Sequence, residues 1–167
     1  DSALKDLLDS QYELRNTEFE LSLDKPDPLF VVRDNLAQKN IDEIAVVCAL
    51  LAYGNAGQIL KTLMKLKRNF ALLGDKGAIK NANFPLYRFQ TSNDIKNLFL
   101  ALSEIIECGG IKRVFMEAYL KAKDSCESKC ESIESPTIHG INAMIDALFG
   151  ALQKNGANLT QGLRFLI

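Results

Sequence analysis

The sequence lacks an excess of charge, a long apolar run and a dense set of cysteines, and each absence excludes a class of protein. Its 20 basic and 21 acidic residues leave a formal net charge of −1, so the chain as a whole is not drawn to nucleic acid or to an anionic membrane. No apolar run approaches the ~20 residues that a membrane-spanning helix needs. A local basic patch remains compatible with this balance.

Four cysteines in 167 residues do not form the pattern of a secreted domain held together by disulfides. The first ten residues are acidic and mixed, without the basic start and apolar core of a signal peptide. These features predict a cytoplasmic protein. Cys48 lies in the most apolar stretch of the chain, so we expect it to be a small core residue.

Apolar residues recur at helical spacing along almost the whole chain, and no series of β-strands is recognisable. We expect helices over 2–15, 28–36 and 42–53, then after Asn55, after the Thr91–Asp94 capping box, after Gly110, from Pro136, and after a cap at Asn158. Between them, 74–91 and the polar stretch 121–135 are predicted to be loops.

The expected fold is therefore all-α, a single domain over 1–167 in which seven or eight helices form a multi-helix orthogonal bundle. In the helix that starts at Pro136, apolar residues are expected to face inward; they are Ile138, Ile141, Ile145, Leu148 and Leu152. The apolar end Phe165–Ile167 predicts that the natural polypeptide continues, or else that a final helix docks on the core.

The helix predicted over 42–53 is apolar on all faces, which places it at the centre of the domain. Gly54 is expected to end it through a positive φ, and Asn55 is expected to cap the next helix. In that next helix Lys61, Lys65 and Arg68 fall on one face at i, i+4 and i+7. Such a stripe suits phosphate binding, and it equally suits an ordinary solvated face.

Arg88 lies between Tyr87 and Phe89 within the predicted loop 74–91. Arginine beside aromatic rings suits phosphate contact and base stacking, and it also suits the anchoring of a loop to the core. Both interpretations stay open at this point.

Cys126, Cys130 and the single histidine, His139, are the only group of candidate metal ligands. A fourth ligand is missing and the spacing is unlike that of zinc fingers, so we expect solvated thiols, no metal and no cofactor. Glycine-rich phosphate loops, HExxH and GxSxG are absent, and no catalytic residue can be assigned.

Several short motifs occur in an order that resembles a known bacterial family. They are Asp27-Pro28, Asp42-Glu43-Ile44-Ala45, Leu51-Ala52-Tyr53-Gly54-Asn55, Tyr87-Arg88-Phe89 and the terminal Gly162–Ile167. The chain resembles the N-terminal part of DUF2400, a domain of unknown function. Full-length members continue with further segments similar to the helix-hairpin-helix DNA glycosylases, in which a late Asp is catalytic, and neither segment is present in this chain.

The resemblance implies a place for Tyr53, Gly54 and Asn55. In such glycosylases a buried helix ends in a loop at the mouth of the DNA cleft, where a wedge residue fills the stack when a base is flipped out. The alternative is a corner that only packs. The resemblance thus implies DNA binding with base-excision chemistry in the full-length protein; the other hypothesis is a non-catalytic helical module that binds a small ligand or a protein.

Overall fold

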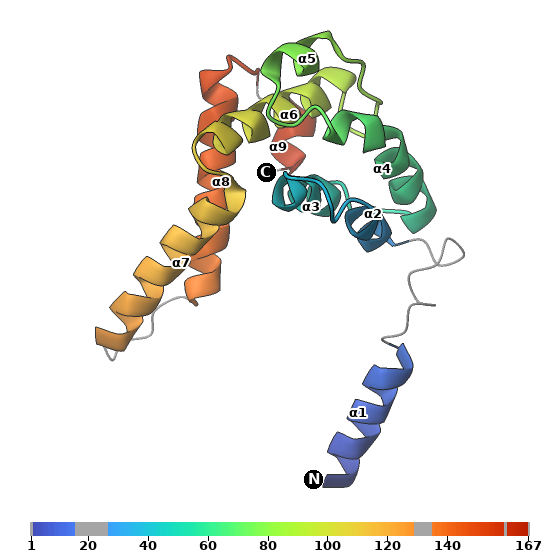
Figure 1. Ribbon diagram of the computed structural model, residues 1–167, viewed down its shortest axis with the longest axis vertical. Helices are drawn as coiled ribbons and strands as arrows, with labels where there is room; N and C mark the ends of the chain where they lie inside the picture. Colours follow the sequence, from blue (N-terminus) through green and yellow to red (C-terminus); the bar gives the residue numbers. More distant parts are fainter. Residues whose placement is uncertain (1, 16–26, 129–134, 159, 167) are drawn as a thin grey trace.

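The computed structural model describes residues 2–15, 27–128, 135–158 and 160–166 (Figure 1). Within these ranges the protein is helical and forms no strand beyond an isolated antiparallel bridge between Tyr87 and Gln90, which confirms the all-α class. The helices are α1 (Ser2–Arg15), α2 (Pro28–Asp34), α3 (Ile41–Leu50), α4 (Ala56–Phe70), α5 (Lys76–Asn81), α6 (Ser92–Glu107), α7 (Ile111–Ser128), α8 (Pro136–Lys154) and α9 (Gln161–Leu166).

Two predicted helix starts are confirmed by their capping hydrogen bonds. Asp27 accepts from the Leu29 N–H at 2.7 Å, directly before Pro28. At α6 the Asp94 N–H donates to Thr91 Oγ1 at 3.1 Å, and the Thr91 N–H donates to Asp94 Oδ2 at 2.8 Å. This reciprocal pair satisfies donors that the first helical turn leaves without a backbone partner.

The helix predicted over 42–53 is shorter and less buried than expected. α3 ends at Leu50, and Asp42 and Ala49 are exposed while Ile44 is fully buried. The prediction that this helix is enclosed on all sides is therefore wrong. An exposed alanine costs little, so an apolar run of this kind tolerates one face in solvent.

Both predicted loops contain helix. α5 lies inside 74–91, and its start is capped by Asp75, which accepts from the Ala78 N–H at 2.9 Å. α7 runs on through the polar stretch as far as Ser128, so 121–128 is helical. This stretch was predicted to be a loop because it is polar, but it contains Lys, Ala and Glu, which are good helix formers. Residues 129–134 lie outside the described part.

Two details at the C-terminal end also differ from the prediction. The cap of α9 is Thr160 rather than Asn158, because the Leu163 N–H donates to Thr160 Oγ1 at 3.1 Å. In α8 the inward-facing residues are Leu148 and Leu152, while the apolar side chains nearer its start are exposed; they are Ile138, Ile141 and Ile145. The first half of α8 packs on α7 rather than on the body, and these three side chains stay exposed beside that contact.

In the described part of the chain, one cluster of buried apolar side chains is shared mainly by α3, α4, α6, α8 and α9, and Phe70 stacks on Phe99 within it. Cys48 belongs to this cluster as predicted, and burial raises the pKa of its thiol to about 12. In Figure 1, α7 and α8 extend from the body as a pair, and α1 stands apart from it. Among the described residues, no helix is long and apolar enough to cross a bilayer.

Candidate functional site

The turn Tyr53-Gly54-Asn55 joins α3 to α4, as the sequence predicts. Gly54 has φ +98°, a conformation that side chains with a Cβ rarely adopt. Asn55 caps α4 by accepting from the Gln58 N–H at 3.1 Å. The predicted roles of these two residues in the backbone are confirmed.

Tyr53 is held in place by neighbours from two segments, 87–90 and α9. Its hydroxyl donates to Gln90 Oε1, and its carbonyl oxygen accepts from the Tyr87 hydroxyl at 2.9 Å. Its ring meets the edges of Tyr87 and Phe165 at centroid distances of 5.3 and 4.9 Å. Burial raises the pKa of the Tyr53 hydroxyl above its ordinary value of 10.0. Tyr53 thus organises a cluster and is itself half-buried.

Arg88 is the residue that the structure brings onto this turn. Its Cζ lies 5.6 Å from the centroid of the Tyr53 ring and 6.0 Å from that of Tyr87, within the range of a cation–π contact. A Cβ added at Gly54 would lie 2.1 Å from an Arg88 guanidinium nitrogen, so the guanidinium rests directly on the glycine. Arg88 also has φ +50°, an uncommon conformation outside glycine that is often found at functional sites.

Two exposed phenyl rings continue the surface beside Arg88. Phe89 and Phe165 are 64% and 57% exposed, and their ring centroids lie 5.5 Å apart. Together with Gln161 and Gly162 they line a pocket of about 450 Å³. Large aromatic side chains with this much exposure are unusual for a surface that only contacts water.

α9, which carries Phe165, is held against the rest of the body by polar contacts between residues far apart in sequence. Gln90 Nε2 donates to the Gly162 carbonyl oxygen at 2.9 Å. The hydroxyl of Thr160 donates to Asp94 Oδ1 at 2.7 Å, and Asp94 is fully buried. Sequence reasoning missed Gln90 and gave Phe165 no place in the site. The available signals were the Tyr87-Arg88-Phe89 series and the terminal Gly162–Ile167 motif.

The basic stripe of α4 is exposed as predicted. Lys61, Lys65 and Arg68 make no ion pair with any acid in the described ranges, whereas Lys67 beside them pairs with Asp34. At ~1.5 Å per residue the stripe is about 10 Å long and begins about 9 Å from Asn55. The turn and the stripe therefore follow one another along α4.

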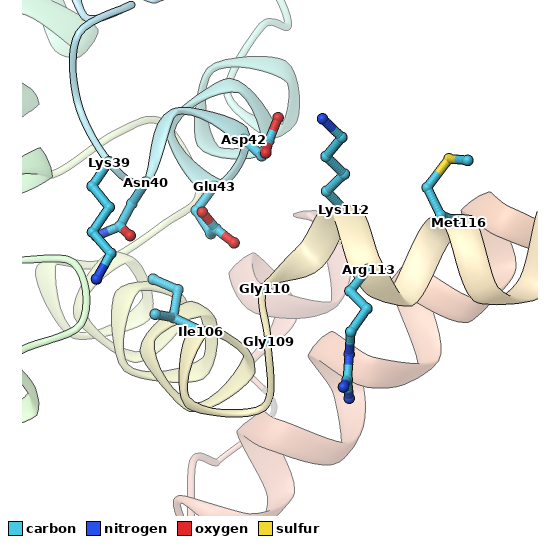
Figure 2. A pocket seen from close by; sticks show the side chains of 10 residues that line it. All are labelled: Lys39, Asn40, Asp42, Glu43, Ile106, Gly109, Gly110, Lys112, Arg113 and Met116. Carbon is cyan, nitrogen blue, oxygen red and sulfur yellow. The ribbon is translucent and has the colours of Figure 1, made fainter.

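A second pocket, of about 460 Å³, lies between the start of α3 and the turn from α6 to α7 (Figure 2). The buried Glu43 accepts from the Ile111 N–H at 2.9 Å, and its carboxylate points into the space that Figure 2 shows between the helices. Lysines 39 and 112 and Arg113 line the same pocket. Asp42 lines it too, so the pocket combines two carboxylates with basic side chains, which sequence reasoning did not predict.

No group of three or more potential metal ligands occurs in the part of the chain that the structure describes. The side chain of Cys126 and all of Cys130 lie outside that part, so the predicted solvated thiols are not tested. His139 lines a small pocket between α7 and α8 beside Ala118 and Ala122.

The fold and surface define an all-helical protein with an arginine and exposed aromatic rings gathered at one inter-helix turn. A family model described as "Protein of unknown function (DUF2400)" matches residues 27–164, and the chain belongs to this family. No curated protein and no solved structure matches it.

Proposed function

We propose that this protein binds DNA through the surface formed by the Tyr53–Asn55 turn, the Tyr87–Phe89 segment and α9, with the basic stripe of α4 beside it. The observation that carries the proposal is the position of Arg88. Its guanidinium lies on Gly54 and over the Tyr53 ring, which in turn contacts the exposed ring of Phe165.

The chemistry of this surface matches the two parts of a nucleotide. Arginine and lysine bind phosphate oxygens, which supplies most of the affinity of non-specific DNA binding. Exposed aromatic rings stack on bases, and each stacked base contributes ~1–3 kcal/mol. The pocket lined by Phe89, Phe165 and Gln161 has a volume of about 450 Å³, which suits an unpaired base. Tyr53 connects it with Arg88, because its ring contacts both Phe165 and the Arg88 guanidinium.

In this arrangement Tyr53, Gly54 and Asn55 act chiefly as the support of the site. Tyr53 is hydrogen-bonded to Gln90, so its ring is held below the surface by the cluster around it. The exposed ring best placed to enter a base stack is Phe89. Base excision, which the resemblance implies for full-length members, has no assigned catalytic group in this chain.

The test is fluorescence anisotropy of labelled duplex DNA, with and without an abasic-site analogue, over a series of salt concentrations. We expect preference for the abasic duplex, because it leaves a stacking position open. Phe89→Ala should weaken that binding about 10-fold, the effect of losing one stacked ring. The matched control is Leu86→Ala, which removes another exposed apolar side chain nearby and should leave the affinity unchanged.

The basic stripe is tested by the salt dependence. Replacing Lys61, Lys65 and Arg68 with alanine should reduce the slope of log affinity against log salt by up to about 3, since each neutralised phosphate contributes ~0.9. Lys80→Ala, which removes an exposed charge on α5, serves as the control. Affinity no better than about 1 mM at low salt would rule the proposal out.

A second candidate is the binding of a small ligand, and the pocket around Glu43 favours it. An anionic group facing Lys39, joined to a hydroxyl facing Glu43, would match these two side chains. Lys112 lies on the other side of the pocket, beside Asp42 (Figure 2). Ribose 5-phosphate is a suitable probe. It should raise the melting temperature of the protein, and Lys39→Ala should abolish that increase. No increase at millimolar probe would remove this candidate.

A further inference from the structure

One side of the α7–α8 pair carries an apolar surface that no described element covers. The residues are Met116 and Leu120 on α7 and Ile138, Ile141 and Ile145 on α8, and they are 36–47% exposed. We call them the hairpin patch. Their presence on one side follows from how the two helices pack.

Phe115 and Gly140 mark the inner faces of the pair, because a Cβ at Gly140 would lie 2.5 Å from the Phe115 ring. Met116 and Ile141 each follow these positions by one residue, a rotation of about 100° in an α-helix. The two helices run in opposite directions (Figure 1). In an antiparallel pair, equal rotations away from the facing sides bring residues to the same side, so α7 and α8 contribute to one continuous patch.

A second apolar surface, which no other helix covers within the described residues, lies on α1. Leu4, Leu7, Leu8 and Tyr12 follow at helical spacing and are 57–68% exposed. A helix of this length without tertiary contacts is only marginally stable in water. The α1 stripe therefore needs a cover if α1 is to persist.

The two surfaces match in length and in charge. Leu4 to Tyr12 spans ~12 Å of helix and Ile138 to Ile145 spans ~10 Å. α1 carries three acids and two bases, whereas α7 carries four bases and three acids, so the two helices have net charges of opposite sign. Exposed apolar stripes of this kind pack as helices in a bundle do.

We propose that α1 docks on the hairpin patch of its own chain and completes a three-helix bundle with α7 and α8. Residues 16–26 join α1 to the body, so the two surfaces meet at an effective concentration of the order of 1 mM. That is well above the concentration of second copies in a dilute sample. The same chain is therefore the favoured source of the covering helix.

The test is hydrogen–deuterium exchange of the full-length protein, read by mass spectrometry over residues 2–15. Docking should protect these amides. Leu8→Asp on α1 and Ile141→Asp on α8 should each remove the protection, while α6 stays protected as proof of folding. Matched controls place the same charge off the two surfaces: Ser10→Asp on α1 and Gln153→Asp, about two turns beyond Ile145 on α8, should leave α1 protected.

Three outcomes would overturn the inference. The first is that residues 2–15 exchange as fast as an unstructured peptide. The second is that their protection survives Ile141→Asp, which would mean that α1 is covered elsewhere. The third is that protection grows with protein concentration between about 1 and about 100 µM, which would mean that a second copy supplies the helix, because docking within one chain at ~1 mM effective concentration does not depend on protein concentration. If the protection of residues 2–15 does not depend on protein concentration and is lost in both Leu8→Asp and Ile141→Asp, docking within the chain is supported.

Discussion

Gly162→Ala tests whether α9 holds the proposed DNA surface together. A Cβ at this position would lie 2.3 Å from the Phe89 carbonyl oxygen, 3.0 Å from its carbon and 3.1 Å from Asp94 Oδ2. Two of these atoms belong to the backbone and cannot swing aside, so α9 must shift. The shift lengthens the hydrogen bond from Gln90 Nε2 to the Gly162 oxygen and separates Phe165 from Phe89.

The expected loss of unfolding free energy is about 2–4 kcal/mol. Overpacking a tight site costs ~1–3 kcal/mol, and a lost hydrogen bond adds ~1 kcal/mol. Urea unfolding followed by circular dichroism measures the total. The chain has no tryptophan, and two of its four tyrosines, Tyr53 and Tyr87, lie in this cluster, so tyrosine fluorescence reports in part on the cluster in the same titration.

Gly150→Ala on α8 provides the matched control. A Cβ there would meet no atom within 4 Å, so the variant should be neutral or gain up to about 1 kcal/mol from helix propensity. If Gly162→Ala costs less than about 0.5 kcal/mol, within the usual effect of a surface substitution, the close approach of α9 to Phe89 does not occur in solution.

Two further predictions concern titratable groups. Hydrogen bonds from Lys154 and Lys76 hold the pKa of Glu104 below its ordinary value of 4.5. The ionised Glu104 therefore stabilises the fold above pH 4.5, and this contribution is lost as the pH falls through its lowered pKa. Urea unfolding from pH 7 downward should show a steeper fall in unfolding free energy for the unmodified protein than for Glu104→Gln. Equal slopes for the two proteins would contradict the pairing. Burial raises the pKa of Cys48 to about 12, so iodoacetamide at pH 8 should modify the exposed Cys108 and leave Cys48 unreacted in the folded protein, as mass spectrometry of the peptides would show; comparable labelling of both would refute its burial.

Local sequence signals predicted the helix starts well. Asp27, Asn55 and Thr91 all cap helices as expected, because a cap depends on a few adjacent residues and a hydrogen bond between them. Polarity was a poorer guide. The stretch 121–128 is helical despite its charges, since intrinsic helix propensity does not depend on an apolar face.

The candidate site was predicted only in part because its contacts join distant segments. Sequence spacing placed Gly54 and Asn55 in a turn, but nothing in it showed that Arg88 would rest on that turn. The bond from Tyr53 to Gln90 spans 37 residues, and the bond from Gln90 to Gly162 spans 72. Such pairings are set by the packing of helices, which a single sequence does not display.

The carboxylate of Glu43 at the start of α7 has a consequence for the order of folding. It caps a helix whose first N–H lies 68 residues further along the chain. α7 and α8 are sequence neighbours and can pair early, because contacts between nearby residues close quickly. Their attachment at Ile111 must wait until α3 exists. The hairpin is thus expected to form as an independent unit first and to acquire its fixed direction only when the body has assembled.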